Sequence, residues 1–111
     1  MKTSELTGAA LDWAVAKCEV GAEFIGEIDD PHFYSTDWAH GGPIIERESI
    51  AILGDGDLYW EAECVWAWAR GFDDGFFQKG PTPLIAAMRC YVTLKLGDEV
   101  EVPEELKEVM A

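Results

Sequence analysis

The sequence predicts one α+β domain, in which a small antiparallel sheet of three to five strands is flanked by an N-terminal and a C-terminal helix. Apolar residues recur at helical spacing at the start of the chain and again near its end. Between them lie short segments of alternating hydrophobicity that turn-forming residues separate. A chain of 111 residues has room for one hydrophobic core, so residues 1–111 are expected to form a single domain.

Both helices carry recognisable boundaries. Leu6, Ala10 and Cys18 mark one apolar face and predict a helix from about Ser4 or Thr7 to Glu19, with Gly21 able to end it. In the second helix, Thr82 suits the N-cap, Pro83 the first helical position and Gly97 the position just past the end.

The strands are expected in residues 22–28, 44–53, 59–69 and 99–103, and residues 70–80 are expected to be a loop. The clearest alternation lies in 59–69, where Trp60, Ala62 and Cys64 share one face and two glutamates lie on the other. Residues 29–43 are rich in turn formers and predict a long connection that enters a strand at Ile44. Residues 103–109 suggest a further turn of helix.

The charge excludes some partners. With 22 acidic and 8 basic residues the formal net charge is −14, which argues against direct nucleic-acid binding and against anionic membrane surfaces. Residues 75–97 contain no acid, however, and include Lys79, Arg89 and Lys95. An acidic protein with one such segment repels polyanions but can admit a small anion.

The cysteines, Cys18, Cys64 and Cys90, are odd in number and far apart, so neither a disulfide framework nor a CxxC metal pair is expected. Buried free thiols in a reducing compartment are the better interpretation. The N-terminal residues lack the pattern of a signal peptide, and no apolar run is long enough to cross a bilayer. The protein is therefore expected to remain in the cytoplasm in which it is made.

The sequence contains no motif that is typical of a particular enzymatic reaction. The sequence has no nucleotide-binding glycine motif and no G-x-S-x-G, and His32, Asp37 and His40 match no metal-ligand spacing. We therefore expect no metal, no cofactor and no enzymatic activity. A small hydrolase that uses His40 and Asp37 is the weakest alternative.

The segment "STDWAHGGPIIERE", residues 35–48, is either a polar turn or a ligand-binding loop. Adjacent glycines allow a ligand to approach the backbone closely, while an aromatic ring and a downstream arginine add stacking and charge. Arg89 is either an arginine whose head reaches water, a structural ion-pair partner or a residue that binds a phosphate or a carboxylate. The predicted ligand-binding residues are Ser35, Thr36, Asp37, Trp38, His40, Gly41, Gly42, Arg47, Lys79, Thr82 and Arg89.

Trp60, Trp66 and Trp68 recur at a period of two and are core or interface residues. A small domain cannot enclose five tryptophans fully, so a homo-oligomer is expected.

Three segments resemble the phage NinX-like proteins, a domain of unknown function in tailed phages and prophages. They are "MKTSELTGAALDWAVAKCE", "STDWAHGGPIIERE" and "GPTPLIAAMRCYVTLKLGDEVEVPEEL". The stretch before "STDWA" is shorter here than in the family, and residues 50–58 and 69–78 depart most from it, as surface loops do. The resemblance implies an accessory phage protein in the bacterial cytoplasm and carries no catalytic residues.

Two functions follow. The first is a non-enzymatic module that binds a small anion and sequesters a nucleotide signal of host anti-phage defence. The second is an acidic protein-interaction module that mimics nucleic acid and inhibits a host nucleic-acid or defence enzyme; it needs one continuous acidic surface, notably over Asp98 to Glu108. A structural phage protein without a ligand is a third possibility.

Overall fold

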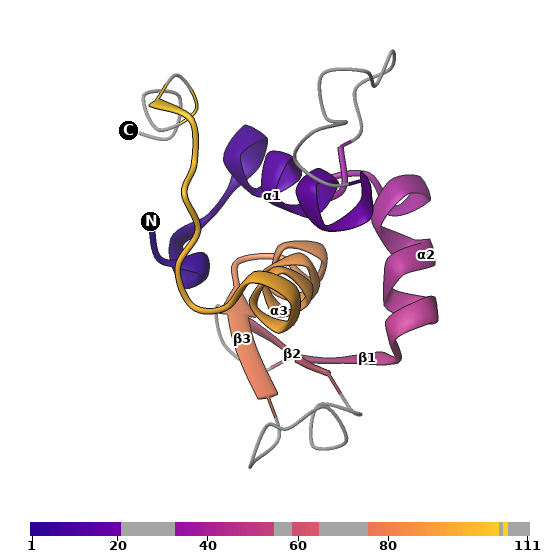
Figure 1. Ribbon diagram of the computed structural model, residues 1–111. Coiled ribbons are helices and arrows are strands. Elements are labelled where there is room, and N and C mark those ends of the chain that lie inside the picture. The colour runs from indigo at the N-terminus through magenta and orange to yellow at the C-terminus, as the bar shows by residue number, and fades with distance from the viewer. Residues whose placement is uncertain (21–32, 55–58, 65–75, 105, 107–111) are drawn as a thin grey trace.

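The computed structural model describes residues 1–20, 33–54, 59–64, 76–104 and 106, and a helix lies at the centre of the fold (Figure 1). The described elements, in chain order, are the 3-10 helix η1 (Thr3–Glu5), α1 (Gly8–Val20), α2 (Trp38–Glu48), β1 (Ile50–Gly54), β2 (Trp60–Cys64), β3 (Phe76–Gly80) and α3 (Pro83–Leu96). Helices near both ends of the chain flank a three-stranded antiparallel sheet, which confirms the predicted α+β class.

The sheet has the order β1-β2-β3, so β1 and β3 are its edges. Both pairings are antiparallel, and Ala62 of β2 lies opposite Ile52 on one side and Gln78 on the other. Ala62 and Cys64 are buried. The alternation predicted for this strand is therefore confirmed at Ala62 and Cys64, whereas Trp60, which was expected on the same core face, is 39% exposed.

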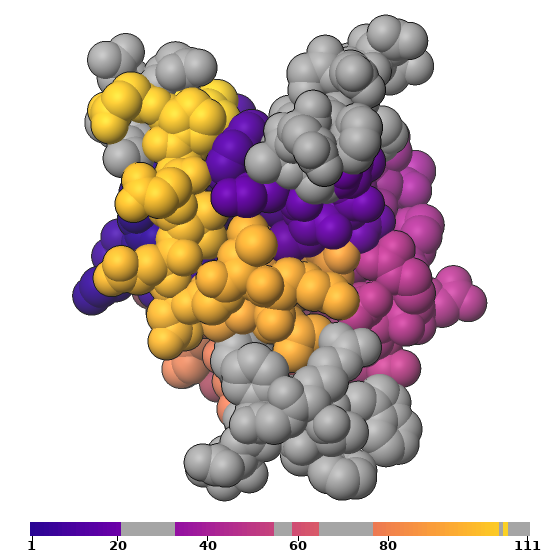
Figure 2. Space-filling view, in the orientation of Figure 1, coloured from indigo at the N-terminus to yellow at the C-terminus, as the bar shows by residue number. Residues whose placement is uncertain are grey.

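Helix α3 is the centre of the core because it contacts each of the other elements. Its boundaries are those that the sequence predicts. The Thr82 hydroxyl accepts a hydrogen bond from the Ile85 amide at 3.1 Å, Pro83 opens the helix, and Gly97 ends it with φ of 92°. Figure 2 shows α1, α2 and the segment after α3 packed around it on one face of the molecule.

The N-terminal segment pairs with the segment that follows α3. The Met1 amino group donates to the Val100 carbonyl at 2.9 Å, and Lys2 forms an isolated β-bridge with Glu99. The expected strand over 99–103 is reduced to this bridge. The expected first helix is confirmed as Gly8–Val20.

The local structure differs from the predictions in two places. Residues 70–80 were expected to be a loop, but Phe76–Gly80 forms β3. Residues 38–43 were expected to be a loop and Ile44 to begin a strand, but Trp38–Glu48 forms a helix with Pro43 inside it. Asp37 caps that helix, since its Oδ1 accepts from the Ala39 amide at 2.9 Å. The strand expected over 44–53 begins at Ile50, after Ser49 has ended the helix with φ of 54°.

Other expectations fall outside the described residues: the strand over 22–28, Trp66, Trp68 and most of the helical turn over 103–109. In the ranges that the structure describes, no helix is long and apolar enough to cross a bilayer.

Candidate functional site

Arg89 is a buried cation in the middle of α3, and two backbone carbonyls hold it in place. Its Nε donates to the Leu6 carbonyl at 2.8 Å and its Nη1 to the Lys79 carbonyl at 2.7 Å. Burial lowers the pKa of Arg89 below its usual value, and the charge of Glu5 opposes this. Because carbonyls are neutral, these two bonds orient the guanidinium without cancelling its charge, and no carboxylate in the described ranges bonds to it.

A hollow of about 490 Å³ adjoins this guanidinium. It lies where η1 contacts β3, the edge strand whose Lys79 carbonyl accepts a hydrogen bond from Arg89. The lining residues are Ser4, Tyr59, Phe77, Gln78, Lys79 and Arg89.

The walls of this hollow combine charge with aromatic rings. Lys79 adds a second cation, although its Nζ lies 3.6 Å from Glu61 Oε1. Phe77 and Tyr59 are each 52% exposed. The side-chain amide of Gln78 donates a 3.1 Å hydrogen bond to the hydroxyl of Thr93. Because Thr93 is buried in α3, this bond fixes the Gln78 side chain in the wall of the hollow. The hollow therefore offers a fixed guanidinium, an exposed ammonium and two aromatic faces.

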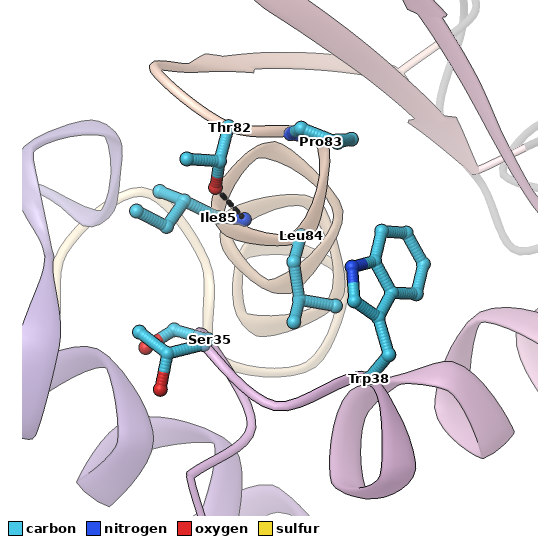
Figure 3. Close-up of a pocket in the computed structure, with 7 residues that line it drawn as sticks. Ser35, Trp38, Thr82, Pro83, Leu84 and Ile85 are labelled. Atoms are coloured by element: carbon cyan, nitrogen blue, oxygen red, sulfur yellow. Dashed lines mark hydrogen bonds between the residues drawn. The ribbon is translucent and has the colours of Figure 1, made fainter.

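A second hollow, of about 230 Å³, lies between the start of α2 and the start of α3 (Figure 3). Its lining residues are Ser35, Thr36, Trp38, Thr82, Pro83, Leu84 and Ile85. Figure 3 shows Ser35 and Trp38 on opposite sides of Leu84. The Ser35 hydroxyl donates to Asp12 Oδ1 at 2.7 Å, and the Thr82 hydroxyl caps α3, so both polar groups already serve the fold.

The predicted ligand-binding residues His40 and Gly41 lie within α2 and form hydrogen bonds to neighbouring residues of the chain. His40 Nδ1 accepts from the Phe33 amide at 2.9 Å, and the Gly41 amide donates to the Asp37 carbonyl at 3.0 Å. A Cβ at Gly41 would clash with the Tyr34 carbonyl, whereas one at Gly42 would meet nothing within 4 Å. Gly41 thus allows a close helix approach and does not expose a free amide to a ligand.

Arg47 is already paired. Its Nη1 and Nη2 donate to the two Glu19 oxygens at 3.1 Å and 2.7 Å, and its Nε donates to Glu48 at 2.9 Å. Arg47 lines neither hollow.

The structure therefore separates the predicted ligand-binding residues. Lys79 and Arg89 share the larger hollow, while Ser35, Thr36, Trp38 and Thr82 share the smaller one.

Sequence reasoning did not select Ser4, Tyr59, Phe77 and Gln78, which complete the larger hollow. The sequence signals for this region were the absence of acids from residues 75–97 and the isolated charges of Lys79 and Arg89 within it. Ser4 could not be found in that way, because its place beside β3 depends on packing between distant parts of the chain.

The fold and the larger hollow define a small α+β protein with a candidate anion-binding site. The family model described as "Bacteriophage P22, NinX" matches residues 2–95, so the chain belongs to this phage NinX family. A comparison with curated proteins gives no match.

Proposed function

We propose that this phage protein is a non-enzymatic binding module for a small anion, and that the hollow beside Arg89 is its site. The observation that carries the proposal is a buried guanidinium whose described hydrogen bonds go to carbonyls, in a chain of net charge −14. Carboxylates are abundant in this protein, yet Arg89 is held by neutral groups. Such an arrangement leaves positive charge for an incoming anion.

The guanidinium geometry favours a phosphate or a carboxylate. Nε and one Nη1 hydrogen are used by Leu6 and Lys79, which fixes the plane of the group and leaves the Nη2 side for a ligand. The Lys79 ammonium and the Ser4 hydroxyl, on the walls of the same hollow, supply further donors. The acidic surface would repel long polyanions while a small ligand still reaches the hollow.

The aromatic walls favour a ligand that also carries a planar ring. Phe77 and Tyr59 line the hollow together with the two cations. Nucleobases stack on aromatic side chains while their phosphates bind to arginine and lysine. We therefore propose a nucleotide as the ligand and, because the chain belongs to a phage family, sequestration of a nucleotide signal of host anti-phage defence in the bacterial cytoplasm.

Binding without catalysis is part of the proposal. The described side chains that line the hollow include no carboxylate, imidazole or thiol that could act as a general base. The ligand is expected to be released unchanged.

Native mass spectrometry with a nucleotide panel tests the proposal and also reports whether the chain is the homo-oligomer we propose. The panel contains mononucleotides, cyclic di- and trinucleotides and ADP-ribose derivatives. Arg89→Lys and Arg47→Lys form a matched pair, because only Arg89 lines the hollow. We expect Arg89→Lys to weaken binding about tenfold or more, since lysine lacks the planar fork, and Arg47→Lys to leave it unchanged. Absence of binding by the folded protein, or equal effects of the two substitutions, would overturn the proposal.

A second candidate rests on the segment after α3. Asp98, Glu99 and Glu101 are exposed there, while Val100 and Val102 are buried and anchor the segment to the core. A row of carboxylates on a fixed backbone could occupy the nucleic-acid site of a basic host enzyme. A double substitution, Glu99→Lys with Glu101→Lys, would then abolish inhibition of such an enzyme and leave nucleotide binding intact; retained inhibition would exclude this role.

A further inference from the structure

Cys64 and Cys90 form a buried pair of thiols between the sheet and the central helix. Their Sγ atoms lie 2.8 Å apart, and Cys64 Sγ also lies 3.8 Å from the Cys90 carbonyl oxygen. Cys64 is the last residue of β2, and Cys90 follows Arg89 on α3. Both residues are buried, and neither is part of a disulfide in this structure.

We propose that this pair is a covalent modification site, at which hydrogen peroxide or a comparable two-electron oxidant closes an intramolecular disulfide. The bonded separation of two sulfurs is about 2.05 Å, so the two Sγ atoms need to approach by less than about 1 Å. A displacement of that size is within the reach of side-chain rotation. This proposal is independent of the anion site.

The reaction balances in two steps. One thiolate sulfur attacks a peroxide oxygen, the O–O bond breaks, and a sulfenic acid and one water form. The second sulfur then attacks the sulfenic sulfur, the S–S bond forms, and the S–O bond breaks with release of a second water. The two thiols together lose two electrons and two hydrogens, and the peroxide is reduced to two waters.

The surroundings make this oxidation slow but selective. The hydrogen bond with Cys64 and burial both raise the pKa of Cys90, which keeps the reactive thiolate scarce. Cys18, on α1, is the competing thiol, and burial raises its pKa to about 12. Within the described residues no sulfur lies in hydrogen-bond contact with Cys18, so a sulfenic acid formed there lacks the resolving thiol that Cys64 and Cys90 provide for each other.

A Cys64–Cys90 disulfide would tie the end of β2 to α3. The two residues are 26 positions apart in the sequence, and closing a loop of that length restricts the unfolded chain. A rise in Tm on the order of 10 °C is expected, and a reductant should reverse it.

The test compares the parent protein with a Cys18→Ser variant, in which only the proposed pair remains. Each is treated with hydrogen peroxide while folded, and each is refolded from urea in a glutathione redox buffer, which gives the oxidant access to both thiols. Intact mass, peptide mapping after alkylation, and Tm with and without reductant are measured. We expect a loss of the mass of two hydrogen atoms, a Cys64–Cys90 peptide and the higher Tm in both proteins, with Cys18 of the parent still open to alkylation.

A Cys64→Ala variant is the negative control and should gain neither the cross-link nor the rise in Tm. If that variant does not fold, Cys18→Ser alone still decides the question. Two free thiols in Cys18→Ser after refolding in the redox buffer would overturn the proposal. A parent cross-link that contains Cys18, or stable higher oxides at Cys64 or Cys90, would also overturn it.

Discussion

Arg47 and Glu19 form a two-point ion pair that joins α2 to α1, with N–O distances of 3.1 Å and 2.7 Å. Tyr91 of α3 completes the contact: its hydroxyl donates to Glu19 Oε2 at 2.5 Å and accepts from Arg47 Nη2 at 3.1 Å. Three helices are thereby connected at one cluster of side chains. An arginine that sequence reasoning assigned to a ligand instead makes a structural contact.

Arg47→Ala is expected to destabilise the protein by about 1 kcal/mol, because the pair is partly exposed and water screens it. The measurement is the urea midpoint at neutral pH. Lys17→Ala serves as the matched loss of a cation, since Lys17 lies over the Trp13 ring and outside this cluster; its effect should stay within about 0.5 kcal/mol. Equal midpoints for Arg47→Ala and the parent would show that the contact contributes nothing.

The Arg47–Glu19 ion pair also predicts that the stability of the protein depends on pH. Hydrogen bonds from Arg47 lower the pKa of Glu19, with Tyr91 adding to this and burial opposing it. A carboxylate with a lowered pKa stabilises the folded state above its unfolded pKa of about 4.3, and that contribution is lost as the pH falls through the lowered value. The difference in unfolding free energy between the parent and Glu19→Gln should therefore be largest near neutral pH and shrink below about pH 4. A difference that is constant with pH would contradict this.

Local rules could predict α3 but not α2. The ends of α3 are encoded within a few residues, by a Thr82 cap, Pro83 and Gly97. In α2 the adjacent Gly41, Gly42 and Pro43 favour a turn by intrinsic propensity. There the outcome depends on tertiary packing, since Ile44 is buried and Gly41 lies against α3. The cap at Asp37 was the one local signal of a helix.

The two glycines of α2 should respond oppositely to alanine. A Cβ at Gly41 would lie 2.6 Å from Leu84 Cδ1 and would clash with the Tyr34 carbonyl, so Gly41→Ala should cost about 1–3 kcal/mol. A Cβ at Gly42 would meet nothing within 4 Å, so Gly42→Ala should stabilise by about 0.5–1 kcal/mol through helix propensity. Urea unfolding of both variants measures this. Equal shifts of the same sign would contradict the packing of α2 on α3.

The cap of α3 gives a further test, because this helix contacts every other element. Thr82→Ala removes the hydroxyl that accepts from the Ile85 amide and should cost about 1 kcal/mol. Thr82→Ser keeps an oxygen in the same place and should change stability by less than about 0.5 kcal/mol. Tm or urea midpoints of the two variants decide it, and equal losses would point to the threonine methyl group instead of the cap.

For the candidate site, the sequence could indicate which charged residues take part but not which groups lie next to them in the fold. Arg89 is conspicuous as the single charge between Pro83 and Leu94, and Lys79 lies in the same acid-free segment. The carbonyls that orient Arg89 belong to Leu6 and Lys79, which are 83 and 10 residues away. A backbone carbonyl has no side-chain signature, so its use as a partner emerges only when η1, β3 and α3 pack together.

The aromatic wall of that site can be tested by comparing Phe77 with a similarly exposed hydrophobic residue outside the hollow. Phe77 and Leu53 are 52% and 58% exposed and lie on edge strands of the same sheet, but only Phe77 lines the hollow. If a nucleobase stacks on Phe77, Phe77→Ala should weaken nucleotide binding by about 1–3 kcal/mol, whereas Leu53→Ala should not change it. Titration calorimetry with a mononucleotide and with ribose 5-phosphate, which lacks the base, measures both effects. Ribose 5-phosphate should bind more weakly to the parent and be insensitive to Phe77→Ala. Equal affinity for the two ligands would mean that the hollow recognises only the phosphate, through Arg89.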